Sequence, residues 1–271
     1  MQENYFLMRI KALILDLDGT VYLDGTPIKN VISQLNDLHL KNVHIQFLTN
    51  NTSVEKATYV NKLKKMGLYF VDDTHVLSPI DAFIAFAKKE KIKHCYYLLP
   101  NKVIGYIEEN GGPKMGFTDP DLVLVGFDRE LTYEKLERAC GLINSNVPYS
   151  ITHIDLACPT KYGPIPDCGS ISNLIRNTTN KNWEYDFGKP SYRLGDIIVS
   201  LLKEKGIAIE ESVLIGDRYY TDIALGNLIG AKTCHVQTGE SFVLSENDPD
   251  NLWPTFEYKN ICEFIQSELS N

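Results

Sequence analysis

The sequence of 271 residues contains no run of basic side chains, and this absence excludes one class of partner. It carries 27 Lys and Arg against 35 Asp and Glu, so its formal net charge is -8 at pH 7 and its pI is near 5.3. Because binding to a nucleic-acid backbone needs clustered cations, we expect no nucleic-acid partner. A small anionic substrate would need local help from a metal ion or a well-placed lysine.

Long apolar runs and closely spaced cysteine pairs are also missing. No stretch reaches the roughly 18 apolar residues that a membrane-spanning helix needs. Residues 1–8 lack the basic and apolar regions of a signal peptide. The six cysteines include no Cys-x-x-Cys motif, which favours reduced thiols, and whether Cys158 meets Cys168 stays open. We therefore expect a cytoplasmic protein with no membrane partner.

An acidic stretch follows a predicted core strand near the start of the chain. Residues 10–15 form an apolar run typical of a buried strand, and Asp16-Leu17-Asp18-Gly19-Thr20 comes directly after it. Strand alternation predicts that the side chains of Asp16 and Asp18 point to the same side. Two carboxylates that close repel each other, and a divalent cation offsets the repulsion. The alternative is that the two acids only cap the next turn.

The pattern that follows predicts alternating strands and helices in a parallel sheet. We expect a helix from about Pro27 to Lys41 and a strand over 43–48. Thr52 and Glu55 fit a capping box, which predicts a helix from Thr52 to Gly67. The final third repeats the pattern, with helices expected over 192–205, 221–229 and 260–269, strands over 213–215 and 232–236, and a polar loop over 241–254.

The middle of the chain repeats shorter strand and helix units and is long enough to be a separate domain. We therefore predict a doubly wound α/β core made of residues 1–78 and 187–271, with residues 79–186 inserted as a second α/β domain. Pro79 stands at a position that helices tolerate, so a helix is expected to begin there. Within the insert, strands are expected over 94–99, 121–127 and 149–153, and helices over 103–110, 132–145 and 170–180.

Three further polar clusters lie at predicted strand or helix ends: Leu48-Thr49-Asn50, Gly188-Lys189-Pro190, and Gly216-Asp217 with Asp222. Parallel strands end at one edge of a sheet, so these clusters are expected to converge with the first acidic stretch. Carboxylates hold Mg²⁺, a helix N-terminus binds phosphate, and a lysine adds positive charge. Together these groups indicate phosphoryl transfer. Taken singly, each also fits a helix cap or a solvated side chain.

In this order and context the four motifs resemble those of the haloacid dehalogenase (HAD) superfamily of hydrolases, which implies a Rossmann-like core. An α/β insert between the second and third motifs resembles the cap domain of the branch that contains NagD-like, p-nitrophenyl and phosphoglycolate phosphatases. The runs Val123 to Asp128 and Asp155 to Ser170 also match that branch.

The resemblance implies a role for each acid of the first motif. Asp16 would attack phosphorus and form an aspartyl-phosphate intermediate. Asp18 would protonate the leaving oxygen and later activate water. The dehalogenases of the superfamily lack an acid at the position of Asp18, so its presence favours phosphate-ester hydrolysis.

The resemblance also implies a Mg²⁺ cofactor and a phosphate-binding set. The ion would be bound by the side chains of Asp16 and Asp217 and by the main-chain carbonyl of Asp18. Asp222 would orient either Lys189 or metal-bound water. The phosphoryl oxygens would be held by Thr49, Asn50 and Lys189.

The insert departs from the pattern of its relatives at two places. Relatives usually have Pro-Gly-Ala-Gly-Ser where this chain has Pro166-Asp167-Cys168-Gly169-Ser170, and Asn-Pro in place of His153-Ile154. A carboxylate of Asp167 at the mouth of the site would repel a second anion and accept hydrogen bonds from hydroxyl groups. We therefore expect Asp167 and Cys168 to favour sugar-like phosphate monoesters over phosphoglycolate.

Two other functions are compatible with the same motifs. A phosphotransferase or mutase would pass the phosphoryl group to an organic acceptor, and a non-catalytic domain would only bind phosphometabolites. The second alternative is weakened because no motif acid is missing. The expected partner is a small-molecule phosphate ester, and a homodimer formed through the insert stays open.

Overall fold

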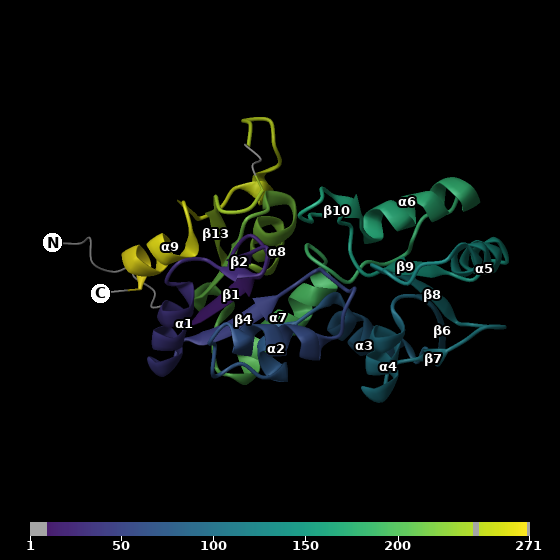
Figure 1. Cartoon of the computed structure of the whole chain (residues 1–271), viewed down its shortest axis with the longest axis horizontal. Helices are drawn as coiled ribbons and strands as arrows, with labels where there is room; N and C mark the ends of the chain where they lie inside the picture. The colour runs from purple at the N-terminus through teal and green to yellow at the C-terminus, as the bar shows by residue number, and fades with distance from the viewer. Residues whose placement is uncertain (1–9, 241–243, 270–271) are drawn as a thin grey trace. The chain divides into compact units, whose positions relative to one another are not determined.

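The structure is a computed structural model that describes residues 10–240 and 244–269. The predicted absence of a signal peptide in residues 1–8 lies outside this part of the chain, as do the first residues of the predicted loop over 241–254. The described residues form two compact units (Figure 1). The first unit contains the described residues up to Leu48, Val60–Val76 and those from Gly195 onward, and the second contains Thr49–Tyr59 and Leu77–Leu194.

A six-stranded sheet in the order β14-β13-β12-β1-β4-β5 is the centre of the first unit. The chain starts in the middle of this sheet and builds outward in both directions, which is the doubly wound arrangement. The predicted α/β class is confirmed. The strands are β1 (Ala12–Asp16), β4 (His44–Leu48), β5 (Val76–Leu77), β12 (Ser212–Gly216), β13 (Lys232–Val236) and β14 (Phe256–Tyr258).

The register of the sheet aligns the ends of its central strands. β1 pairs in parallel with β4, so that Asp16 lies opposite Leu48, and in parallel with β12, so that Leu15 lies opposite Ile215. All residues of β1 are buried, as expected of a strand covered by helices on both faces. The helices that accompany the sheet are α1 (Val31–Leu40), α2 (Lys56–Lys65), α7 (Tyr192–Glu204), α8 (Ala224–Ile229) and α9 (Ile261–Glu268).

Helix α1 begins later than its apolar spacing predicts. The expected start at Pro27 was wrong, because Tyr22–Leu23 (β2) and Thr26–Pro27 (β3) pair as a short antiparallel hairpin. Asn30, in the left-handed region with φ 69°, then precedes the first helical residue. Proline at the end of such a hairpin needs no ladder hydrogen bond, so this alternative costs the backbone nothing there.

Helix α2 also begins later, at Lys56, so the capping box predicted from Thr52 and Glu55 was wrong. The Thr52 hydroxyl has tertiary partners instead: it accepts the N–H of Phe127 at 3.1 Å and lies 3.2 Å from Thr152 Oγ1. Residues 49–55 are not helical. The helix N-terminus expected to bind phosphate therefore does not follow the second motif directly.

The second unit contains a four-stranded parallel sheet in the order β7-β6-β8-β9, drawn in teal in Figure 1. The three strands expected there are confirmed. Its core joins β6, β8 and β9 to α5 and α6 through buried apolar side chains. The strands are β6 (His94–Leu98), β7 (Lys114–Met115), β8 (Leu122–Val125), β9 (Tyr149–Ile151), β10 (Ala157–Cys158) and β11 (Ile165–Pro166), and the helices are α3 (Pro79–Glu90), α4 (Asn101–Glu109), α5 (Tyr133–Asn144) and α6 (Cys168–Thr179).

Three sequence expectations concern the chain as a whole. Within residues 10–240 and 244–269, no helix combines the length and apolarity needed to cross a bilayer. None of the six cysteines, all of which lie within the described residues, forms a disulfide bond, so Cys158 and Cys168 are not joined by one. The second unit is wider than the predicted insert of residues 79–186, because it also takes in residues 49–59, 77–78 and 187–194. The assignment of that insert as a cap domain stays a prediction.

Candidate functional site

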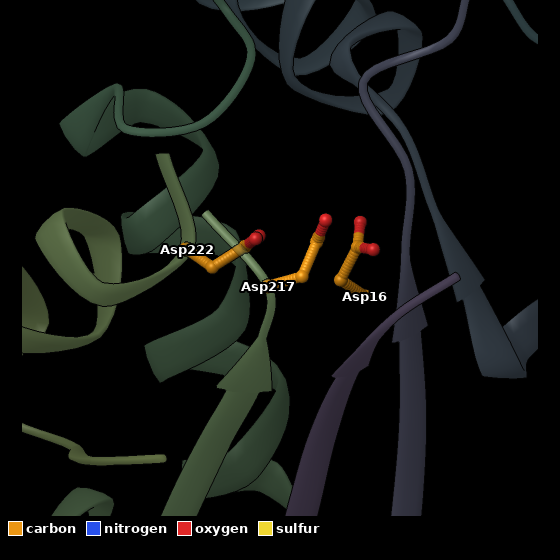
Figure 2. Close-up of side chains that lie close together, drawn as sticks. All are labelled: Asp16, Asp217 and Asp222. Carbon is orange, nitrogen blue, oxygen red and sulfur yellow. The ribbon is translucent and has the colours of Figure 1, made fainter. Parts of the chain in front are cut away.

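Three buried carboxylates meet at the carboxyl ends of two neighbouring strands of the first unit. Asp16 is the last residue of β1, Asp217 follows β12, and Asp222 lies in the π-helical segment Tyr219–Ile223. One oxygen from each carboxylate lies within 4.8 Å of the others. Figure 2 shows the Asp222 side chain directed toward the other two. The three residues are 8%, 5% and 1% exposed.

This cluster fits a hard divalent cation. Like charges at such separations repel strongly when they are buried, and a cation between them removes the repulsion. The donor set consists only of carboxylate oxygens, which is the set that Mg²⁺ prefers. The resemblance implies that the Asp18 carbonyl is a ligand beside Asp16 and Asp217 and that Asp222 stands outside this set, and these assignments stay predictions. The structure places the Asp222 carboxylate close to those of Asp16 and Asp217.

The main chain of two loops encloses the Asp217 carboxylate. A Cβ atom on Gly19, whose φ is +94°, would lie 2.5 Å from Asp217 Oδ2, and one on Gly239 would overlap the same oxygen. The N–H of Glu240 donates to Asp217 Oδ2 at 2.8 Å. The Thr238 hydroxyl donates to the Gly19 carbonyl and joins the two loops. Glycine is required at both positions because the Asp217 carboxylate occupies the space that a Cβ atom would need.

Asp222 is held in a similar way by the start of its own turn. A Cβ atom on Gly216 would overlap the Asp222 carboxylate, so the end of β12 must lack a side chain there. The N–H of Arg218 donates to Asp222 Oδ2 at 3.2 Å. The π-helical segment Tyr219–Ile223 thus brings the Asp222 side chain back to the carboxyl end of β12.

A histidine of the neighbouring strand supports the backbone of this cluster. His235 of β13 donates from Nε2 to the Asp217 carbonyl at 3.1 Å, and its ring stacks on Tyr219 with centroids 3.9 Å apart. The Tyr219 hydroxyl donates to Glu257 at 3.2 Å, and burial together with that carboxylate raises the pKa of Tyr219 to about 12. His235 belongs to none of the four motifs, and only its place in the predicted strand over 232–236 could have indicated it.

Asp18 lies in a tight turn and is exposed, so the two acids of the first motif do not share one environment. The turn passes through Gly19, and the Tyr22 hydroxyl donates to Asp18 Oδ2 at 3.1 Å. Lys62 Nζ lies 3.4 Å above the ring centroid of Tyr22. Burial lowers the pKa of Lys62, and the charge of Asp18 partly opposes this shift. Neither Tyr22 nor Lys62 stands in one of the four motifs, so no sequence signal marked them.

The second unit brings together two of the predicted phosphate-binding residues. Asn50 Oδ1 accepts the N–H of Lys189 at 2.7 Å, and Asn50 Nδ2 donates to the Lys189 carbonyl at 3.2 Å and to Asp155 Oδ2 at 3.1 Å. Thr49 Oγ1 accepts the N–H of Asn51 at 3.2 Å. Thr49, Asn50 and Lys189 are all buried. Asp155 was missed, although it stands in a run that resembles the family.

The two predicted specificity residues lie inside the second unit. Asp167 caps α6 by accepting the N–H of Cys168 at 2.6 Å, and it is only 4% exposed. Burial raises the pKa of the Cys168 thiol to about 11. The expectation that the Asp167 carboxylate stands open at the mouth of the site was wrong. The exposed tip of this loop is formed by Lys161 and Tyr162, and the effect of Asp167 on specificity stays a prediction.

Comparisons with known proteins agree with these features. A family model described as haloacid dehalogenase-like hydrolase matches residues 13–112, and a HAD-hydrolase-like model matches residues 186–263. The acid sugar phosphatase of Staphylococcus aureus (strain USA300) is 27% identical over 259 residues, which is 96% of this chain and 98% of that protein.

Solved structures extend the similarity to the whole fold. The structure of a 4-nitrophenylphosphatase from Thermotoga maritima has a TM-score of 0.87 and 33% identity, covering 98% of this chain and 100% of that one. A structure described as a putative nagD protein has a TM-score of 0.85 and 32% identity, covering 97% and 98% of the two chains. The chain therefore belongs to the haloacid dehalogenase-like hydrolases, in the branch of NagD and the p-nitrophenyl phosphatases.

Proposed function

We propose that this chain is a Mg²⁺-dependent phosphatase that hydrolyses small phosphorylated metabolites through an aspartyl-phosphate on Asp16. The observation that carries the proposal is the buried cluster of Asp16, Asp217 and Asp222, in a chain of this hydrolase family. The names of its relatives, an acid sugar phosphatase and a 4-nitrophenylphosphatase, support the reaction class.

The cofactor would be held by the carboxylates of the cluster. When bound, Mg²⁺ would neutralise negative charge on the phosphoryl group that is transferred. The contribution of the chain is to keep Asp217 and Asp222 in fixed orientations through the N–H groups of Glu240 and Arg218.

The reaction would proceed in two displacements at phosphorus. In the first, a carboxylate oxygen of Asp16 forms a bond to phosphorus while the bond to the ester oxygen breaks, and Asp18 gives its proton to the departing alkoxide. In the second, Asp18 takes a proton from water, whose oxygen bonds to phosphorus and displaces the Asp16 carboxylate. Inorganic phosphate leaves. Thr49, Asn50 and Lys189 would bind the phosphoryl oxygens during both displacements.

The exposure of Asp18 suits this role, because a general acid must reach a substrate that arrives from solvent. The Tyr22 hydroxyl, 3.1 Å from Asp18 Oδ2, limits the directions in which the carboxyl group can point. For the substrate we propose sugar-like or polyol-like monoesters. This choice is supported by the acid sugar phosphatase similarity.

The test is inorganic phosphate release from a panel of sugar phosphates, polyol phosphates and phosphoglycolate, each with Mg²⁺ and with a chelator. The full chain and its Asp16→Asn variant are compared on the same panel. We expect release that requires Mg²⁺ and is absent in the variant. Faster turnover of phosphoglycolate than of every sugar phosphate contradicts the proposed substrate class.

The same assay separates the two alternatives. A phosphotransferase consumes the ester and yields a phosphorylated acceptor without releasing phosphate, which phosphorus NMR detects. A binding domain shows calorimetric binding of an ester and no turnover on any member of the panel.

A further inference from the structure

The two places where the insert departs from the pattern of its relatives are in contact with each other. His153 Nε2 lies 2.9 Å from Asp167 Oδ1, although fourteen residues separate the two in the chain. Their side chains are 0% and 6% exposed. Buried polar groups must be hydrogen-bonded to avoid a large desolvation cost, so each of these two residues requires the other. Relatives with Asn at the first position and Gly at the second lack both partners.

Both ring nitrogens of His153 are bonded, which fixes the orientation of the ring. An ionised carboxylate only accepts hydrogen bonds, so Nε2 donates to Asp167. Nδ1 lies 2.9 Å from Thr152 Oγ1, and that oxygen lies 3.2 Å from Thr52 Oγ1. Through Thr152, the pair is thus linked to Thr52, which lies two residues after the second motif.

The pair also adjoins the residues proposed to bind phosphate. Asp155, two residues after His153, accepts the side-chain N–H of Asn50 at 3.1 Å and, through its carbonyl, the N–H of Gly169 at 2.8 Å. A Cβ atom on Gly188 would lie 2.6 Å from His153 Cβ and 2.7 Å from Asn50 Oδ1. The main chain before Lys189 is therefore packed between the histidine and the asparagine.

We propose that His153 and Asp167 form a positioning pair that sets the affinity for the phosphoryl group. The pair anchors residues 153–155 to the start of α6, Asp155 then orients Asn50, and Asn50 holds the main chain of Lys189 from both sides. This inference rests on the proposed role of Asn50 and Lys189 in phosphate binding. Neither member of the pair touches substrate.

The experiment measures the dissociation constant of inorganic phosphate by calorimetry in the presence of Mg²⁺, together with kcat and KM for the best ester. The variants of the full chain are His153→Asn, Asp167→Ala, the double variant and Asp167→Asn. Because small displacements of binding groups weaken recognition strongly, we expect the phosphate Kd and the KM to rise about tenfold in the first two variants. We expect kcat to change by less than about threefold, because the chemical groups are untouched.

The double variant is expected to bind phosphate no more weakly than either single variant, since both remove the same contact. Asp167→Asn retains an oxygen that accepts from His153 Nε2 and from the Cys168 N–H, so it is expected to restore the wild-type Kd. A purely structural role would lower the melting temperature and leave the Kd of the folded fraction unchanged. That result overturns the proposal.

Two control variants separate the failure of this inference from the failure of the proposed function. His94→Asn changes an exposed histidine of β6 in the same unit and is expected to bind phosphate as the wild type does. If Lys189→Ala binds phosphate normally, the proposed phosphate site is wrong. If Lys189→Ala weakens binding and the pair variants do not, only the positioning role is wrong.

Discussion

The main chain at Gly239 lies so close to the Asp217 carboxylate that no side chain fits between them. The next N–H along the chain, that of Glu240, donates to the same carboxylate oxygen at 2.8 Å. The loop after β13 therefore holds Asp217 in one orientation, even though it provides none of the three clustered carboxylates itself.

Gly239→Ala is expected to weaken metal binding, because the added methyl group must displace Asp217 or the loop. Groups that orient metal ligands are typically worth about 10–100-fold in affinity, and we expect a loss in that range. Titration of Mn²⁺ into the full chain, followed by its electron paramagnetic resonance signal, measures the affinity directly. Gly141→Ala in α5, where a Cβ atom meets no atom within 4 Å, is the matched control. Equal Mn²⁺ affinity in the two variants contradicts this prediction.

Asp18→Asn is expected to lower kcat for alkyl phosphates by at least about 10²-fold, the usual contribution of a general acid and base. With p-nitrophenyl phosphate, whose leaving group needs no proton, the first displacement should proceed and the aspartyl-phosphate should accumulate. Rapid-quench measurement then shows a burst of p-nitrophenol equal to the enzyme concentration. A uniform loss of rate on both substrates with no burst argues against Asp18 as the group that activates water.

The acidic cluster is expected to cost stability when no metal is bound. Asp217→Asn removes one charge from a buried group of three carboxylates and keeps an oxygen that accepts the N–H of Glu240. In chelator, this variant should therefore melt at a higher temperature than the wild type. On addition of Mg²⁺ the order should reverse, because only the wild type gains binding energy. Scanning calorimetry measures both melting temperatures in chelator and in Mg²⁺. An Asp217→Asn variant that melts below the wild type in chelator contradicts the prediction.

Acid is expected to destabilise the first unit through His44, the first residue of β4. Burial, followed by the positive charges of Lys205 and His75, lowers the pKa of His44 from 6.5 to about 4. Between pH 6.5 and about 4, His44 therefore binds a proton in the unfolded chain but not in the folded chain. His44 therefore costs no free energy of unfolding above pH 6.5, and the free energy of unfolding falls as the pH decreases from 6.5 toward 4.

His44→Gln is expected to make stability depend less on pH in this range. The measurement is the midpoint of urea unfolding at pH 7 and at pH 5. The matched control is His94→Gln, because His94 is exposed. The control should retain the slope of the wild type. A His44→Gln variant with an unchanged difference between the two midpoints removes His44 as the source of acid sensitivity.

The meeting of Asp16 and Asp217 could be predicted because it depends on the periodicity of the sheet. Apolar runs mark β1 and β12, parallel strands end at one edge, and each acid stands directly at such an end. The convergence of Asp222 on the same edge was also predicted, but the closeness of its carboxylate to the other two was not. This closeness depends on the π-helical turn, in which the Ile223 N–H reaches back five residues to the Arg218 carbonyl at 3.3 Å.

Tertiary partners account for two of the other errors. Thr52 has the local sequence of a helix cap, but its hydroxyl bonds to Phe127 and Thr152, 75 and 100 residues away. Asp167 stands in a polar loop that reads as exposed, yet its partner His153 draws it into the interior. Local patterns carry no information about such partners, so burial at these positions became clear only from the structure.

The Asp217 carboxylate is held by the main-chain N–H of Glu240 and not by a side chain. We therefore expect position 239 to tolerate no substitution and position 240 to tolerate many. Every residue except proline supplies the N–H now donated by Glu240, whereas only glycine leaves room at the position before it. A library randomised at both positions and selected for phosphate-ester hydrolysis should therefore keep a single amino acid at the first and a broad mixture at the second.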